Sequence, residues 1–147
     1  MREILFRGKT TNNGKWVYGY IDYNFNTKIA FMRTPKHIYT DVDMVIPETV
    51  GQYTGITDKN GKKIFEGDIV KNDWCFMKGN SIIRFGEYKS FDMSNDFRQG
   101  HLGFYIEALS ESKKMLYRKD ILYYADKCEV IGNVFDNPEL LKGEGKE

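Results

Sequence analysis

Residues 51–70 read GQYTGITDKNGKKIFEGDIV, and this stretch decides the fold. Short apolar runs alternate in it with two groups of turn-forming residues. Asn60-Gly61 suits the positive φ angles of a tight hairpin turn. Gly67 supplies backbone freedom for a second turn, in which the Asp68 carboxylate can accept hydrogen bonds from nearby amides. Short strands joined by turns at this spacing predict a small β-barrel or sandwich.

The same pattern continues toward the N-terminus. Asn13-Gly14 separates an apolar run at residues 2–7 from the aromatic run 16–21, and this predicts a hairpin. Alternation places Trp16, Tyr18 and Tyr20 on one face of the second strand. Because the opposite face also carries apolar residues, we expect this hairpin to be covered on both sides. Further strands are predicted at 28–32 and 42–46.

Toward the C-terminus, strands are predicted at 69–77, 81–85, 102–109 and 129–135. Residues 86–100 mix polar and aromatic residues without a period, and we expect a long connection there. One helical turn is predicted at 120–126, with Asp120 as its N-cap. Another helix is predicted with Asn137 as its N-cap and Pro138 at its first position, and the charged tail 142–147 is expected to fray.

Composition restricts the class of protein. A chain of 147 residues allows one domain or two very small modules that share a core. Aromatic residues make up 15% of the chain, which favours strands. The net charge of +1 argues against a protein that coats nucleic acid, although a local basic patch remains compatible with it. With no apolar run typical of a signal peptide or a membrane span, we expect a cytoplasmic protein.

The sequence contains no recognisable catalytic or metal-binding motif. The candidate metal ligands His37, His101, Cys75 and Cys128 lack the spacing of a zinc site, and we expect no metal and no cofactor. Both cysteines are expected to be core or half-buried thiols in a reducing compartment. Asp68 is favoured as a turn former over acid–base catalysis with Glu66. We therefore expect that the protein is not an enzyme.

Two segments are candidates for binding. A basic stretch interleaved with apolar residues is the candidate contact with nucleic acid or another partner, and its residues are Lys113, Lys114, Tyr117, Arg118 and Lys119. Small β-barrels bind single strands by stacking bases on aromatic rings in a basic groove. The alternative for this stretch is a solvated loop. Aromatic residues in the 88–105 region form an alternative patch for a protein partner.

Three blocks of the chain resemble the YopX family of phage and prophage proteins. The first is REILFRGK at residues 2–9 followed by GKWVYG at 14–19, and the second is the stretch 51–70. The third is VIGNVFDNPELL at residues 130–141. The blocks follow the family's order from one end of the chain to the other, and residues 86–119 match least.

The resemblance implies a phage or prophage origin and a β-rich fold whose later part is an SH3-like barrel. It implies no activity, and no site residue can be carried over from it. We predict a mainly β protein with an N-terminal β-hairpin module at 1–50 packed with an SH3-like barrel at 51–137. A short C-terminal helix or tail follows at 138–147. The expected function is a non-enzymatic module that binds a macromolecule, first of all a host or phage protein. The alternative is nucleic acid; no membrane is expected as a partner, and the oligomeric state stays open.

Overall fold

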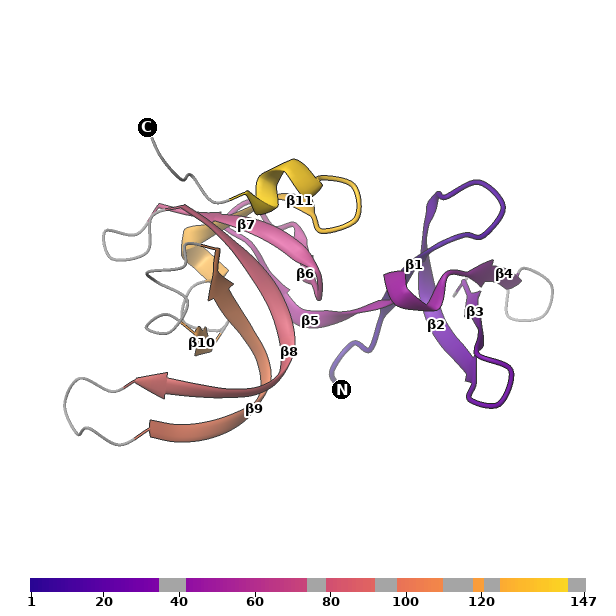
Figure 1. Ribbon diagram of the computed structural model, residues 1–147, viewed down its shortest axis with the longest axis horizontal. Coiled ribbons are helices and arrows are strands. Elements are labelled where there is room, and N and C mark those ends of the chain that lie inside the picture. Colours follow the sequence, from indigo (N-terminus) through magenta and orange to yellow (C-terminus); the bar gives the residue numbers. More distant parts are fainter. Residues whose placement is uncertain (35–41, 74–78, 92–97, 110–117, 121–124, 143–147) are drawn as a thin grey trace. The chain divides into compact units, whose positions relative to one another are not determined.

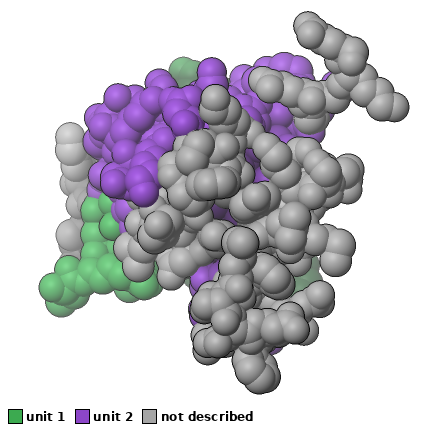
Figure 2. Space-filling model, turned by 90° about the vertical axis from the view of Figure 1, so that its left-hand side faces the viewer, with its two compact units in different colours: residues 1–55 green, residues 56–147 purple. Residues whose placement is uncertain are grey.

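The computed structural model describes residues 1–34, 42–73, 79–91, 98–109, 118–120 and 125–142 (Figure 1). Within these ranges the regular structure is almost entirely strand, in two antiparallel sheets, and the helices are short 3-10 turns. The mainly β prediction is confirmed. The chain forms two compact units, residues 1–55 (unit 1) and 56–147 (unit 2), which Figure 2 colours separately. No described helix is long and apolar enough to cross a membrane.

Unit 1 is built from a twisted antiparallel sheet in the order β4-β3-β2-β1-β5. Its elements are β1 (Phe6–Lys9), β2 (Trp16–Asn24), β3 (Ile29–Arg33), β4 (Val42–Val45), the 3-10 turn η1 (Pro47–Thr49) and the first part of β5 (Gly51–Thr57). The predicted Asn13-Gly14 turn joins β1 to β2, and Gly14 has a φ of 67°. This φ lies in the left-handed region, where glycine carries no steric penalty.

Gly19 is the residue at which β2 changes partner. Residues 16–19 pair with β1, and residues 20–24 pair with β3. At this point the backbone of β3 comes so close that a Cβ on Gly19 would lie 1.9 Å from the carbonyl oxygen of Arg33. Only a residue without a side chain fits here. The close approach of β2 and β3 therefore depends on one glycine.

The core of unit 1 lies on one side of this sheet. Ala30, Met32 and Val45 are buried at its centre, and the apolar residues that pack around them are Phe6, Val17, Ile21, Tyr23 and Val50. An isolated bridge pairs Thr10 with Val45, so the chain just after β1 also contacts β4. The other face of β2 is partly open, since Tyr18 and Tyr20 are 46% and 55% exposed. The expectation that the hairpin is covered on both sides holds only in part, because Arg7 on this second face is buried whereas the two tyrosines are exposed.

Unit 2 contains the end of β5, a hairpin with β6, and a five-stranded sheet in the order β10-β9-β8-β7-β11. The bounds are β6 (Lys63–Phe65), β7 (Asp68–Asn72), β8 (Gly79–Phe91), β9 (Arg98–Ala108), β10 (Arg118–Asp120), η3 (Ala125–Lys127), β11 (Cys128–Asn133) and η4 (Pro138–Leu141). Consecutive strands β7 to β10 form a meander, and β11 returns to pair with β7.

The Asp58 carboxylate holds the turn between β5 and β6 and ties it to β11. Its Oδ1 accepts hydrogen bonds of 2.9 Å from the backbone N–H groups of Asn60 and Lys62. Its Oδ2 accepts one of 2.9 Å from the backbone N–H of Val130, 72 residues further along the chain. Burial by itself raises the pKa of Asp58, but the three N–H donors favour the charged form more strongly, and the pKa lies below its ordinary value.

Asp68 plays a similar part in the next turn. Its Oδ2 accepts a hydrogen bond of 2.8 Å from the backbone N–H of Phe65, and Gly67 has a φ of 82°. The side chain of Asp68 is buried. The predicted turn role of Gly67 and Asp68 is thus confirmed by the geometry.

The core of unit 2 is an apolar cluster between these turns and the sheet. Its buried members are Ile64, Val70, Ile83, Ile106, Cys128 and Val130. The prediction of a core thiol is confirmed for Cys128, whereas Cys75 lies outside the described residues. Burial, and after it the negative charge of Asp58, raises the pKa of the Cys128 thiol to about 11. At neutral pH this sulfur is therefore a neutral apolar group.

This pKa predicts that the Cys128 thiol is inert in the folded protein. Thiolates, and not thiols, attack disulfide reagents, and a buried thiol of pKa about 11 is almost fully protonated at pH 8. We expect a Cys75→Ser variant to give no reaction with an aromatic disulfide reagent at pH 8 until denaturant is added. Fast labelling of this variant under native conditions would contradict the assignment.

The strand predictions are mostly confirmed, and the exceptions involve pairing between distant residues. Residues 86–91 and 98–100 belong to β8 and β9, so the prediction of a connection over 86–100 is wrong for them. Their polar side chains do not prevent pairing, because each strand of this hairpin supplies the backbone partners of the other. The remaining residues of that connection, 92–97, lie outside the described residues.

Two finer predictions need correction, and a third lies partly outside the described residues. Asp120 is the last residue of β10 and pairs with Tyr105; residues 121–124, where the predicted helical turn would begin, are not described, and the described 3-10 turn begins at Ala125. Pro138 starts a 3-10 turn as predicted, but the Asn137 side chain does not cap it. Instead, Asn137 Oδ1 accepts a hydrogen bond of 3.3 Å from the backbone N–H of Asn133. Neither sheet closes into the predicted barrel within the described residues.

Candidate binding surface

The hairpin formed by β8 and β9 extends well beyond the rest of its sheet. Its pairing is continuous from Ser81 opposite Ala108 to Phe91 opposite Arg98. The neighbouring β7 pairs with β8 only as far as Ile82. Figure 1 shows the two strands curving together as a long ribbon. Along this extension the face that carries the core residues Ile83 and Ile106 continues past the edge of β7, and Phe104 on it still packs against the core.

One face of this ribbon carries an apolar patch. Phe85 lies opposite Phe104, and Glu87 lies opposite Leu102, so alternation places these four side chains on the same face. Phe85 is 52% exposed and Leu102 is 72% exposed. The rings of Phe85 and Phe104 meet edge to face, with centroids 5.0 Å apart. We call these four residues the ribbon patch.

The opposite face of the ribbon carries a stack of three rings. The Tyr88 ring lies 5.1 Å from the His101 ring and 5.0 Å from the Tyr105 ring, at interplanar angles of 24° and 29°. Tyr88 and Tyr105 are buried. Beside them, the Arg84 Nε donates a hydrogen bond to the Glu107 carboxylate. These contacts join the side chains of β8 and β9 on the face opposite the ribbon patch.

The charge of the ribbon patch favours a protein over a nucleic acid as its binding partner. Its apolar area comes from Phe85, Phe104 and Leu102, and its one ionisable member is Glu87. A carboxylate at this position repels phosphate groups, whereas it can pair with a lysine or arginine of a protein. Phenylalanine and leucine side chains exposed side by side are typical of protein contact sites.

The predicted basic site is only partly described. Lys113, Lys114 and Tyr117 lie outside the described residues. Arg118 and Lys119 belong to β10, where their backbones pair with Glu107 and Ile106 of β9. Binding of nucleic acid by this stretch stays a prediction. Sequence reasoning placed a protein-binding patch within 88–105 but missed Phe85, and alternation could not have found it, because it puts Phe85 on the same face as the buried Ile83.

The other candidate residues do not converge on a reactive centre in the described part of the chain. His37 and Cys75 lie outside it, His101 stacks on Tyr88, and Cys128 is buried in the core. In the described ranges, no three His, Cys, Asp or Glu side chains are grouped so as to hold a metal ion.

The fold and the ribbon patch together define a mainly β protein of two antiparallel sheets with an exposed apolar surface. The model of the family described as "YopX protein" matches residues 5–142, and the chain belongs to this family. Among solved structures, it is similar to protein EF1440 from Enterococcus faecalis, at 21% identity and a TM-score of 0.48. That alignment covers 97% of this chain and 100% of the other. No curated protein matches the chain.

Proposed function

We propose that this protein is a non-enzymatic β module that binds a host or phage protein through the ribbon patch. The observation that supports the proposal is the exposure of Phe85 and Leu102 on a continuously paired two-stranded extension. Large apolar side chains at the centre of an interface supply most of its binding free energy, because they leave water on association. Glu87 adds a charge that favours a partner with a basic residue.

The proposal includes the origin of the protein and the compartment in which it acts. Membership in the YopX family supports a phage or prophage protein that acts in the bacterial cytoplasm. The strand order of unit 2 also supports kinship with SH3-like barrels, because a four-stranded meander is followed by a 3-10 turn and a last strand that returns to the first.

A capture experiment with surface variants tests the proposal. Tagged protein is used as bait in extracts of a lysogenic host, and the double variant Phe85→Ala/Leu102→Ala is the test. Removing both side chains takes away most of the patch's apolar area, so we expect the affinity for a captured protein to fall by at least about tenfold. The measurement is titration of the purified partner against each variant.

Phe25→Ala is the matched control, since Phe25 is an exposed phenylalanine of unit 1 at 76% exposure. We expect it to bind like the unchanged protein. A partner that binds both variants equally, or that only Phe25→Ala weakens, would reject the ribbon patch. Thermal unfolding of each variant shows separately whether the loss of the Phe85 and Leu102 side chains lowers the stability of the protein.

A further inference from the structure

A second surface, on unit 1, pairs aromatic rings with cations in register. On the outer face of β2, Lys9 lies opposite Trp16, and Arg7 lies opposite Tyr18. Arg33 of β3 lies opposite Tyr20. Each aromatic residue on this face of β2 therefore has a basic residue as its direct neighbour on the adjoining strand. We call these six residues the ladder face.

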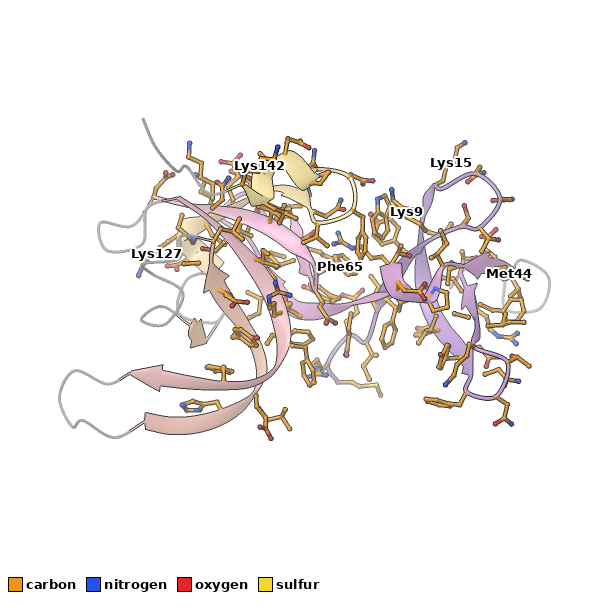
Figure 3. All side chains as sticks on the ribbon, in the orientation of Figure 1. Lys9, Lys15, Met44, Phe65, Lys127 and Lys142 are labelled. Carbon is orange, nitrogen blue, oxygen red and sulfur yellow. The ribbon has the colours of Figure 1, made fainter. Side chains whose placement is uncertain are left out.

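The two tyrosines of the ladder face are open to solvent. Tyr18 is 46% exposed and Tyr20 is 55% exposed, although both belong to the middle of a sheet. Apolar neighbours continue the same face across β3 and β4, where Phe31 lies opposite Met44. Met44, labelled in Figure 3, is 45% exposed. A sheet face with its rings open in this way can stack planar groups from outside the protein.

Arg7 and Lys9 contact the Trp16 ring, and Tyr18 and Tyr20 each have a basic residue opposite them on the next strand. The Arg7 guanidinium carbon lies 4.8 Å from the centre of the Trp16 ring, and Lys9 Nζ lies 5.5 Å from it. These contacts fix Trp16 beside Tyr18. Arg33 forms an ion pair of 3.2 Å with Asp22, in which both side chains are about half exposed. An exposed pair of this kind is weak, so its guanidinium can exchange the carboxylate for another anion.

The charge of the ladder face differs from that of the ribbon patch. Three cations accompany its rings, but Arg7 is buried at 7% exposure, so Lys9 and Arg33 are the two that can meet a ligand, and Asp22 is the acid paired with Arg33. Such a face attracts phosphate, whereas Glu87 on the ribbon patch repels it. The chain's net charge of +1 limits counterion release as a driving force, and for that reason stacking has to supply much of any affinity for nucleic acid.

We propose that the ladder face binds single-stranded nucleic acid by stacking bases on Tyr18 and Tyr20, with Lys9 and Arg33 beside the phosphates. Residues two apart on one strand are about 7 Å apart, roughly twice the rise between stacked bases, so each ring can take one base without crowding the next. Sheet faces with exposed aromatic rings bind single strands in this way with little preference for sequence. The proposal is independent of the protein partner assigned to the ribbon patch.

Fluorescence anisotropy of labelled homopolymers tests this inference on the full chain. The probes are oligothymidylate and oligouridylate of about 12 nucleotides, which distinguish DNA from RNA, and a duplex of mixed sequence. We expect single strands to bind at about 50 mM salt and more weakly at about 200 mM, and the duplex to bind less well. The double variant Tyr18→Ala/Tyr20→Ala should lose at least about tenfold in affinity.

Three further variants separate stacking from charge. Tyr18→Phe/Tyr20→Phe keeps the rings and should bind within about threefold of the unchanged protein, since stacking needs no hydroxyl. Arg33→Ala should reduce the slope of log affinity against log salt by about 0.7, the value for one phosphate contact with a single strand. Lys71→Ala, an exposed cation on β7 of unit 2, should leave binding unchanged.

Several outcomes would overturn the inference. One is no binding to either single strand at low salt. Another is equal binding by Tyr18→Ala/Tyr20→Ala, or a loss in Lys71→Ala as large as in Arg33→Ala. A third is a protein captured through Tyr18 and Tyr20 at high salt with no oligonucleotide binding, which would assign the ladder face to a protein partner.

Discussion

Replacing Asp58 with alanine is expected to lower the free energy of unfolding by about 3–5 kcal/mol. The carboxylate accepts hydrogen bonds from three backbone N–H groups, and the N–H of Val130 is buried. Each donor that loses a charged acceptor away from water costs about 1–3 kcal/mol. Val130 is also part of the core of unit 2, so loosening it affects Cys128 and Ile64 as well. Denaturant unfolding followed by circular dichroism measures the loss.

Asp73→Ala is the control for the loss of one negative charge. Asp73 is exposed and forms an ion pair of 3.3 Å with Lys59, so its removal should change stability by less than about 1 kcal/mol. Asp58→Asn keeps an oxygen for the turn but loses the charge, and we expect a value between the two. If Asp58→Ala cost no more than Asp73→Ala, the carboxylate would not be the link between the turn and β11.

The stabilisation by Asp58 also depends on pH in a defined direction. Its pKa in the folded protein lies below the value of 3.8 for an unperturbed aspartate. The charged form is therefore favoured by folding, and its contribution is complete above about pH 5. It declines as the pH falls through 3.8 toward the lower folded pKa. The difference in stability between the unchanged protein and Asp58→Ala should accordingly shrink below about pH 4.

Gly19→Ala is the second change with a large expected effect, a loss of more than about 3 kcal/mol. A Cβ at this position would lie 1.9 Å from the carbonyl oxygen of Arg33 and 2.7 Å from its carbonyl carbon. These are backbone atoms of a paired strand, so no side-chain rotation can relieve the overlap. β3 would have to move away from β2, and the packing of Met32 would be lost with it. Thermal unfolding gives the magnitude, and hydrogen exchange of the β2 and β3 amides locates the damage.

Gly103→Ala is the matched control, because this glycine also lies within a strand and a Cβ there would have no heavy atom within 4 Å. We expect a change of no more than about 0.5 kcal/mol. A loss in Gly19→Ala no larger than in Gly103→Ala would show that the sheet of unit 1 can bend differently. A variant too unstable to purify would agree with the prediction, and Gly19→Ser would then extend the comparison in the same direction.

The local turns of this protein could be predicted from its sequence. Asn13-Gly14, Asn60-Gly61 and Gly67-Asp68 each occupy a turn, because glycine at a positive φ and aspartate as an acceptor act within a few residues. The hydrogen bond from Val130 to Asp58 could not be predicted in this way. It joins residues 72 positions apart, and nothing near Asp58 in the sequence indicates its partner.

The exposure of the ladder face and of the ribbon patch also could not be predicted from local sequence. Alternation placed Trp16, Tyr18 and Tyr20 on one face, but it could not show that the core of unit 1 gathers on the other. The face of β2 that is covered is the one on which the buried residues of β3 and β4 lie. The sequence pattern does not show how these strands pair with β2. On the ribbon, the polar residues after Phe85 hid the strand because its hydrogen bonds are made with β9 and not locally.

The return of β11 to β7 also affects how the chain folds during synthesis. All strand partners within unit 1 come from the first 55 residues, so its sheet can form early as the chain emerges from the ribosome. In unit 2, by contrast, one edge of β7 stays unpaired until β11 has been synthesised, because Val70 pairs with Val130. Until then this apolar strand edge is exposed to other nascent chains. Strands that are far apart in the sequence pair slowly. We therefore expect the pairing of β11 with β7 to be the step that protects unit 2 from aggregation.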